Sequence, residues 1–262
     1  MLKKQERINM WDKELATAIK AVKLAGDLIL DNFEKKVPII RKSPKEFVTK
    51  LDVECQNIIV ESLERDFPEY NYYLEETRKK QAINGLTWVI DPIDGTHNYI
   101  SGLDNVGISL ALISENNYHL GILFFPMKSM IFSAIEGQGA FCNGKQIHVG
   151  KNLDLSKSMV AYDNQFHLTK STLTNFKTLL EASFTVRILG AASWDFALIA
   201  MGKLDARVWN SAKLVDIAAG YVIVKEAGGE VTDFNFSKPS LSTLKVVASN
   251  GLVHFDLVSL MQ

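Results

Sequence analysis

Hydrophobic and polar residues alternate along this chain with two different periods, which separate helical from strand-forming stretches. Apolar residues recur every three or four positions in residues 11–33 and 49–67, as in amphipathic helices that each bury one face. From residue 106 to residue 149 the apolar runs are short and end in turn residues, as in strands joined by tight connections. The pattern therefore predicts two long helices followed by an antiparallel meander.

The remaining segments alternate between the two kinds of pattern. They predict further strands at residues 70–74, 88–91, 185–188, 206–209 and 246–248, and further helices at residues 168–180, 193–201, 215–227 and 254–261. Helices mixed with runs of strands predict layered sheets and helices, an α+β or α/β architecture. A soft boundary near Gly150 divides residues 1–150, which carry the antiparallel sheet, from an α/β portion at residues 151–262.

Length, composition and charge narrow the class of protein. The chain has 262 residues, 47% of them hydrophobic, which is enough to bury a full core. Its formal net charge of -1 gives no broad basic field, so we expect no nucleic-acid partner. Two cysteines, Cys55 and Cys142, are too few for a disulfide framework and suit a reducing compartment. With no apolar run long enough to cross a bilayer, we expect a soluble cytoplasmic protein with no membrane partner.

The segment from Trp88 to Asn98 carries the most concentrated chemistry. An apolar strand is followed by Asp91, Pro92, Asp94, Gly95 and Thr96, which places two carboxylates beside a turn. Mg²⁺ prefers such hard oxygen ligands and is held in many proteins by one or two carboxylates together with a substrate phosphate. The backbone N–H groups of Gly95 and Thr96 can open a helix and meet that phosphate. The alternative is a simple capped turn, with Asp94 accepting backbone hydrogen bonds and Gly95 at positive φ.

Three further segments with acidic residues follow the same logic. Glu75 and Glu76 end a predicted strand, and Asp216 stands in the first turn of a helix whose next residues are small enough for close packing. Asp52 lies in the first turn of the second helix, where it is either part of an acidic site or only a favourable charge at a helix N-terminus.

Together these segments resemble the inositol monophosphatase family, whose members are Mg²⁺-dependent, lithium-sensitive phosphatases. Residues 88–98 match the family pattern W-x-x-D-P-[IL]-D-G-T-x-N. Residues 215–229 match W-D-x-A-A-G followed by E-A-G-G except that Val215 replaces the tryptophan. Weaker matches are Glu75-Glu76-Thr77, the stretch from Phe47 to Asp52, and the glycine-rich stretch at residues 137–144. The matches span nearly the whole chain in the family's order. The resemblance implies the layered αβαβα phosphatase fold and a homodimer.

The resemblance also implies roles for individual residues. It makes Glu75, Asp91, Asp94 and Asp216 metal ligands, with the Ile93 carbonyl as a further ligand, and it implies two or three Mg²⁺ ions. Asp52 would hold the weaker third ion through water. Thr96, Asp52 and Glu75 would orient the attacking water and take its proton. Gly95, Thr96, Asp94, Ala192, Trp209 and Asp216 would contact the substrate.

Substrate choice is where the chain departs from the family pattern. Inositol-specific members carry a glutamate seven residues before the last metal-binding aspartate, and this chain has Trp209 there. An aromatic ring at that position either packs in the core or stacks on a nucleotide base. Ala192 and Ser193 either contact a substrate hydroxyl or, in the case of Ser193, cap a helix.

The sequence thus predicts Mg²⁺-dependent hydrolysis of a small phosphate monoester, with inositol monophosphate or a similar polyol or sugar phosphate as the leading substrate. Alternatives within the superfamily are a nucleotide 3′-phosphatase acting on 3′-phosphoadenosine 5′-phosphate and a fructose-1,6-bisphosphatase. An alternative of another class is a regulatory binding protein with vestigial phosphatase activity, because a fold does not fix a function.

Overall fold

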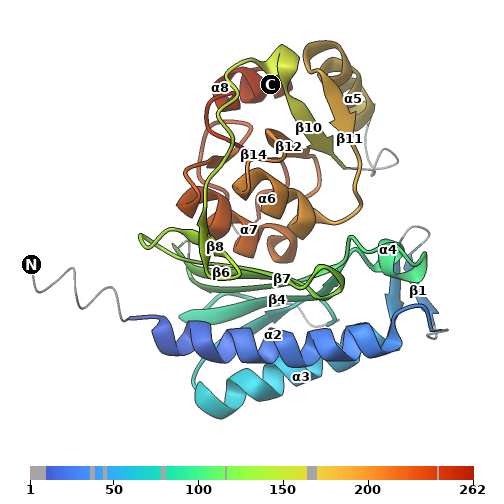
Figure 1. Cartoon of the computed structure of the whole chain (residues 1–262), viewed down its shortest axis with the longest axis vertical. Coiled ribbons are helices and arrows are strands. Elements are labelled where there is room, and N and C mark those ends of the chain that lie inside the picture. The colour runs from blue at the N-terminus through green and yellow to red at the C-terminus, as the bar shows by residue number, and fades with distance from the viewer. Residues whose placement is uncertain are drawn as a thin grey trace, which may run out of the picture.

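The helices and sheets of this protein stack in five alternating layers, as Figure 1 shows for the computed structural model. The structure describes residues 10–35, 39–43, 46–77, 81–115, 117–163, 170–240 and 242–262, with the backbone alone for residues 39–43 and 46–48. From bottom to top of Figure 1 the layers are a helix pair, a seven-stranded sheet, a second helix pair, a five-stranded sheet and a third helix pair. This order confirms the predicted αβαβα architecture.

The larger sheet holds its strands in the order β3-β4-β5-β6-β7-β8-β9. Strands β3 and β4 are parallel and the other neighbours are antiparallel, which confirms the predicted meander. The bounds are β3 Asn71–Leu74, β4 Leu86–Asp94, β5 Gly107–Ser114, β6 Asn117–Phe125, β7 Met130–Ile135, β8 Ala140–Cys142 and β9 Lys145–Ile147.

The smaller sheet has the order β11-β10-β12-β14-β13, parallel from β11 to β12 and antiparallel beyond. Its strands are β10 Met159–Tyr162, β11 Thr185–Arg187, β12 Ala206–Trp209, β13 Glu230–Asp233 and β14 Val246–Ser249. The hairpin β1 Ile39–Ser43 and β2 Glu46–Thr49 stands apart from both sheets. Strands β1, β2, β10 and β13 were not predicted, whereas the equally short β12 and β14 were. Runs of four or five residues carry so little periodicity that only some of them can be distinguished from loops.

Helices fill the layers between and outside the sheets. They are α2 Asp12–Asn32, α3 Lys50–Asp66, α4 Thr96–Ile100, α5 Lys170–Ala182, α6 Ala192–Ala200, α7 Leu214–Glu226 and α8 His254–Met261, with 3-10 turns at Pro126–Lys128 and Leu155–Lys157. The predicted start of α5 at residue 168 lies outside the described residues. Among the helices that are described, none combines the length and the apolar character that crossing a bilayer requires.

Successive side chains of β4 point alternately into two hydrophobic cores. Trp88 and Ile90 pack against α2 and α3 on one face of the larger sheet, while Val89 packs against α6 and α7 on the other. The second of these cores also contains residues of the smaller sheet, so α6 and α7 form a shared middle layer. The larger sheet lies before Gly150 and the smaller one after it. The middle layer packs on both sheets, so the sheets alone do not define two domains. The division into two domains near Gly150 stays a prediction.

Helix α7 lies unusually close to the larger sheet. A Cβ atom at Gly121 on β6 would stand 2.4 Å from the Ala219 carbonyl oxygen of α7, and one at Gly220 would stand 2.1 Å from the Phe196 ring. Contacts this short require glycine at both positions, as the small residues after Asp216 suggested. The close packing brings the first turn of α7 to the end of β4.

His254 at the start of α8 predicts an acid-sensitive stability. Its ring nitrogens contact Ser249 Oγ at 2.8 Å and Thr232 Oγ1 at 2.9 Å. Burial lowers the pKa of His254 from 6.5 to about 4, with Glu230 opposing and Lys225 reinforcing the shift. Between these two pH values the unfolded chain binds the proton and the folded chain does not. The free energy of unfolding should therefore fall, by about 3 kcal/mol from this group, as the pH drops from 6.5 to 4.

Urea unfolding at several pH values measures this effect. In the variant His254→Gln we expect a clearly shallower loss of stability over the same pH range, because the group that titrates is gone. Equal pH slopes for the two proteins would contradict the assignment.

Candidate active site

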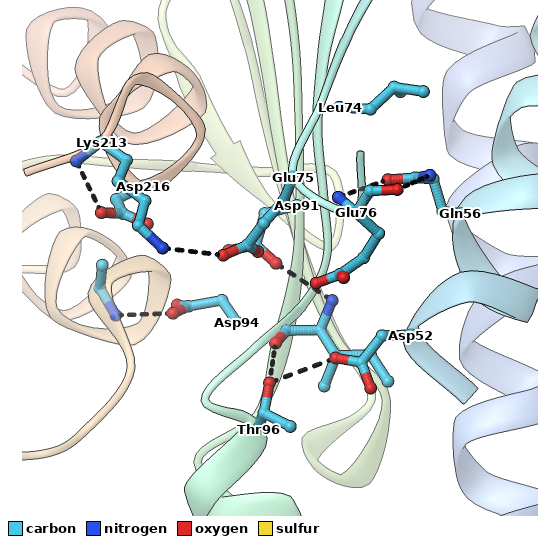
Figure 2. Close-up of polar contacts among 12 residues, drawn as sticks. Asp52, Gln56, Leu74, Glu75, Glu76, Asp91, Asp94, Thr96, Lys213 and Asp216 are labelled. Carbon is cyan, nitrogen blue, oxygen red and sulfur yellow. Dashed lines mark hydrogen bonds and ion pairs between the residues drawn. The ribbon is translucent and has the colours of Figure 1, made fainter. Parts of the chain in front are cut away.

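The predicted site residues come from separate elements that meet at one end of the larger sheet (Figure 2). Glu75 follows β3, and Asp91, Ile93 and Asp94 belong to the C-terminal part of β4. Asp52, Thr96 and Asp216 lie in the first turns of α3, α4 and α7. Helix N-termini carry partial positive charge, so this meeting point favours negative groups.

Strand β4 continues through Pro92, contrary to the prediction that it ends at Asp91. Asp91 pairs with Ser109 and Asp94 with Gly107, so three steps on β4 oppose two on β5. Such a bulge restores Asp94 to the face that Asp91 occupies, although strict alternation would place them on opposite faces. Proline suits the bulge because it has no N–H group to donate to the sheet. The bulge thus directs both carboxylates toward α6 and α7.

Asp94 binds the N-terminus of α6. The backbone N–H groups of Ala192 and Ser193 donate to its two carboxylate oxygens at 3.1 and 2.6 Å. The Ala192 N–H therefore holds a carboxylate, and the predicted contact of Ala192 with the substrate stays a prediction. Helix α6 is also capped by Asp94 and not by Ser193, since its N-cap residue is Ala191.

Asp216 and Glu75 are linked through Lys213. The Lys213 backbone N–H donates to Asp216 Oδ2 at 2.8 Å, and its Nζ lies 3.4 Å from Glu75 Oε1. Burial raises the pKa of Asp216 to about 7, with the negative charge of Glu75 as the next cause. Lys213 was missed by the sequence analysis, because lysine is not among the residues that signal a helix N-cap.

Asp91 is the most strongly perturbed group of the site. Its side chain is 2% exposed, and burial followed by the charges of Glu75 and Asp94 raises the pKa of this carboxyl well above its usual range. Burial also raises the pKa of Asp94, against the hydrogen bonds from α6. Carboxylates that raise one another's pKa in this way need a cation to remain ionised together.

The donor set fits Mg²⁺. It consists of carboxylate and carbonyl oxygens, and the lysine ammonium at Glu75 shows that a positive charge is accepted there. Hydrogen bonds hold Asp94 toward α6 and Asp216 toward α7. Among the described residues, no three acidic, histidine or cysteine side chains are grouped closely enough to form a complete metal site without rearrangement.

Asp52 and Thr96 form a hydrogen-bonded pair beside these carboxylates. Thr96 Oγ1 lies 3.2 Å from Asp52 Oδ1 and 3.0 Å from the Ile93 carbonyl oxygen. Asp52 Oδ2 accepts hydrogen bonds from the N–H and hydroxyl groups of Thr49 at 2.7 and 2.6 Å, which makes it a helix cap as well. Burial raises the pKa of Asp52, and these hydrogen bonds oppose the shift. Both interpretations of Asp52 are therefore compatible with its position.

Gly95 turns the chain from β4 into α4. Its φ of 91° is a left-handed conformation, and a Cβ atom there would lie 2.7 Å from the Asn105 carbonyl oxygen. A side chain is excluded on both grounds. The turn places the N–H groups of Gly95 and Thr96 at the start of α4, next to the carboxylates.

Trp209 does not line the site. Its side chain is 3% exposed, and its ring stacks on Phe196 with centroids 4.6 Å apart. The Arg207 guanidinium lies 4.8 Å from the same ring. The packing interpretation thus describes Trp209, and its predicted place in a substrate wall is wrong for this structure. The cause is the middle layer, which covers the end of β12 with α6.

The layered fold and the acidic site together define a class of protein, the inositol monophosphatase and fructose-1,6-bisphosphatase-like fold with two mixed sheets. The model of the inositol monophosphatase family matches residues 10–261. The chain therefore belongs to the inositol monophosphatase family.

Individual relatives cover most of the chain. It is 34% identical over 247 residues to a fructose-1,6-bisphosphatase/inositol-1-monophosphatase of Thermotoga maritima, covering 92% of this chain and 93% of the relative. It is 30% identical over 254 residues to the Nus factor SuhB of Haemophilus influenzae, covering 94% of both. A solved structure of a Thermotoga maritima IMPase matches with a TM-score of 0.86 and 33% identity, covering 95% of this chain and 96% of that one.

Proposed function

We propose that this protein hydrolyses a small phosphate monoester in a Mg²⁺-dependent reaction. The observation that carries the proposal is the convergence of Glu75, Asp91, Asp94 and Asp216 beside helix N-termini. Burial and the charge of Glu75 raise the pKa of Asp91 and Asp216, and backbone N–H groups hold Asp94 and Asp216. A buried acidic cluster of this kind costs folding free energy unless cations bind it. Membership in the family supports the same chemistry.

The proposed ligands are these four carboxylates and the Ile93 carbonyl oxygen. Mg²⁺ bound there would lower the pKa of a bound water and neutralise negative charge on the phosphoryl group and the leaving oxygen. We propose two ions at these four carboxylates and a third, weaker one near Asp52. Glu75 and Asp91 lie in the middle of the group, between Asp94 and Asp216 on one side and Asp52 and Thr96 on the other (Figure 2).

The chain's own groups position the water and the phosphate. Thr96, hydrogen-bonded to Asp52, would orient the attacking water, and Glu75 or Asp52 would take its proton. The backbone N–H groups of Gly95 and Thr96 would bind phosphoryl oxygens at the start of α4. Asp94 and Asp216 would lie on the side of the site where the leaving group departs. A covalent phosphoenzyme is not required by this arrangement.

The proposed substrates are inositol monophosphate and similar polyol or sugar phosphates. A nucleotide 3′-phosphatase remains an alternative, but the adenine platform that suggested it is absent at Trp209, whose ring is covered by Phe196. Fructose 1,6-bisphosphate is a second alternative, supported by the name of the Thermotoga maritima relative. Residues other than Trp209 must select the substrate.

Phosphate release from a substrate panel tests the function. We expect Mg²⁺-dependent release from inositol 1-phosphate or fructose 1,6-bisphosphate, and little from 3′-phosphoadenosine 5′-phosphate or NADP. Preferential cleavage of 3′-phosphoadenosine 5′-phosphate would replace the polyol assignment by the nucleotide one. No Mg²⁺-dependent release from any of the four would contradict the proposed activity.

A regulatory role is the second candidate, because a relative of 30% identity is named Nus factor SuhB. Thermal unfolding with and without Mg²⁺ separates a working site from a vestigial one. With Mg²⁺ at a hundred times its Kd, we expect about 2.7 kcal/mol of added stability, since only the folded chain presents the ligands. No stabilisation, together with a partner captured equally well in a chelator, would favour the regulatory role.

The family resemblance also leads us to propose a homodimer. Light scattering after size exclusion, with the chain mass of 29.3 kDa as reference, tests this assignment directly.

A further inference from the structure

Two glutamine side chains hold the backbone on either side of Glu75. Gln56 Nε2 donates to the Glu76 carbonyl oxygen at 3.3 Å, and the Glu76 N–H donates to Gln56 Oε1 at 3.0 Å (Figure 2). Gln81 Nε2 donates to the Leu74 carbonyl oxygen at 2.7 Å, and the Leu74 N–H donates to Gln81 Oε1 at 2.6 Å. Each amide therefore contacts both main-chain polar groups of one residue, as a neighbouring strand would.

The local fold explains why the backbone at Glu75 needs such support. Strand β3 is four residues long, lies at the edge of the larger sheet and pairs with β4 alone. The Glu75 N–H makes the last contact with β4, to the Ile90 carbonyl oxygen at 3.1 Å, and the chain then leaves the sheet. Short edge strands and their ends open more readily than central strands. The carboxylate of Glu75 is also repelled by Asp91 and Asp216.

Gln56 joins Glu75 to the helix that carries Asp52. The two α3 residues are four positions apart and lie on the same face of the helix, where Asp52 is 2% and Gln56 4% exposed. Helix α3 thus fixes Asp52 directly and the backbone next to Glu75 through the Gln56 amide. A glutamate at this position would lack the donor for the Glu76 carbonyl, so the amide is the group that the contact requires.

We propose that Gln56 and Gln81 are positioning residues, which hold Glu75 in the orientation that binds Mg²⁺. This inference rests on the proposed function, because it takes Glu75 as a metal ligand. Groups that orient metal ligands change metal affinity by about 10- to 100-fold when they are removed. The two amides together fix the backbone before and after Glu75, so its carboxylate keeps one direction despite the repulsion around it.

Calorimetric titration of the full chain with Mg²⁺ tests the proposal without relying on activity. Methionine has a length similar to that of glutamine but no amide, so Gln56→Met and Gln81→Met each remove two backbone contacts. We expect each variant to bind Mg²⁺ about tenfold more weakly. In activity assays the Mg²⁺ concentration for half-maximal rate should rise, while the KM for the substrate at saturating Mg²⁺ stays close to that of the wild type.

Asn143 provides a matched control at the opposite edge of the same sheet. Its side chain makes the same kind of two-point contact, accepting from the Ile131 N–H at 2.9 Å and donating to the Ser129 carbonyl oxygen at 3.0 Å. Its φ of 49° suits glycine, so Asn143→Gly removes only these contacts. We expect a lower melting temperature and an unchanged Mg²⁺ affinity. An equal loss of affinity in this control would overturn the positioning role.

A double-mutant cycle then asks whether Gln56 acts through Glu75. In the background Glu75→Gln, the change Gln56→Met should not weaken Mg²⁺ binding further, whereas a general structural effect would add to it. An additive loss would overturn the proposal. If Glu75→Gln alone leaves Mg²⁺ binding unchanged, the ligand assignment fails. If Glu75→Gln weakens binding but Gln56→Met and Gln81→Met do not, the positioning role alone fails.

Discussion

Replacement of Asp91 by asparagine should remove Mg²⁺-dependent phosphate release and at the same time stabilise the metal-free protein. Asp91 is 2% exposed, and its pKa is raised by burial and by the charges of Glu75, Asp94 and Asp216. The neutral amide keeps the acceptor for the Ile93 N–H, which donates to Asp91 Oδ1 at 3.1 Å, and removes the repulsion. We expect about 1 to 3 kcal/mol of added stability in a chelator. The loss of a charged ligand should lower the rate of turnover about a thousandfold or more.

Urea unfolding in the presence of a chelator and phosphate release in the presence of Mg²⁺ measure the two effects separately. Asp205→Asn is a suitable control, since Asp205 also accepts a backbone hydrogen bond, from the Met159 N–H at 2.8 Å, but lies outside the acidic cluster. The control should leave Mg²⁺ dependence unchanged. Near-normal turnover by Asp91→Asn would refute the assignment of Asp91 as a metal ligand, and a destabilised metal-free variant would refute the repulsion.

Loss of the Arg207 guanidinium should be among the most destabilising single changes in this chain. Arg207 on β12 pairs through its NH1 group with Asp195 Oδ2 on α6, and the two side chains are 6% and 0% exposed. Even with this partner, burial raises the pKa of Asp195 to about 7. Arg207→Met leaves that carboxyl buried without a cation, and we expect a loss of about 3 to 5 kcal/mol in the free energy of unfolding.

Replacing both partners should restore most of this stability, because two apolar side chains leave no buried charge. We expect the double variant Asp195→Leu with Arg207→Met to unfold within about 1 kcal/mol of the wild type. The exposed pair Lys177 and Glu181, 3.7 Å apart, serves for comparison, and Lys177→Met should change stability little. A double variant as unstable as Arg207→Met would show that packing, and not the unpaired charge, causes the loss.

Most of the helices and longer strands could be predicted from the sequence because their periodicity extends over many residues. Helix α2 was predicted at 11–33 and runs Asp12–Asn32. The short strand β12 was also predicted with its observed bounds, Ala206–Trp209, but other short strands were not. The bulge in β4 could not be predicted from Pro92 alone, because a proline is compatible with both the end of a strand and a bulge. The partner strand β5, which continues to Gly107, decides between them.

The acidic residues of the candidate site were predicted from local patterns, whereas the groups that hold them were not. Lys213 reaches Glu75 across 138 positions, and Ser193 reaches Asp94 across 99. Gln56 and Gln81 occupy unremarkable places in their segments. A side-chain amide forms hydrogen bonds with another segment only where the fold brings the two together, so no local sequence pattern predicts such a contact.

By itself the sequence determined the layered class of the fold, the family and the acidic residues offered as metal ligands. The layered class follows from apolar periodicity, whereas the family and the ligand set follow from the resemblance of short segments to the family's motifs. Both kinds of signal are properties of neighbouring residues. The tertiary structure decided which carboxylates face one another, which backbone groups hold them, and that Trp209 is covered by Phe196. Such outcomes depend on the packing of α6 and α7 between two sheets, because contacts between distant segments arise only when the layers assemble.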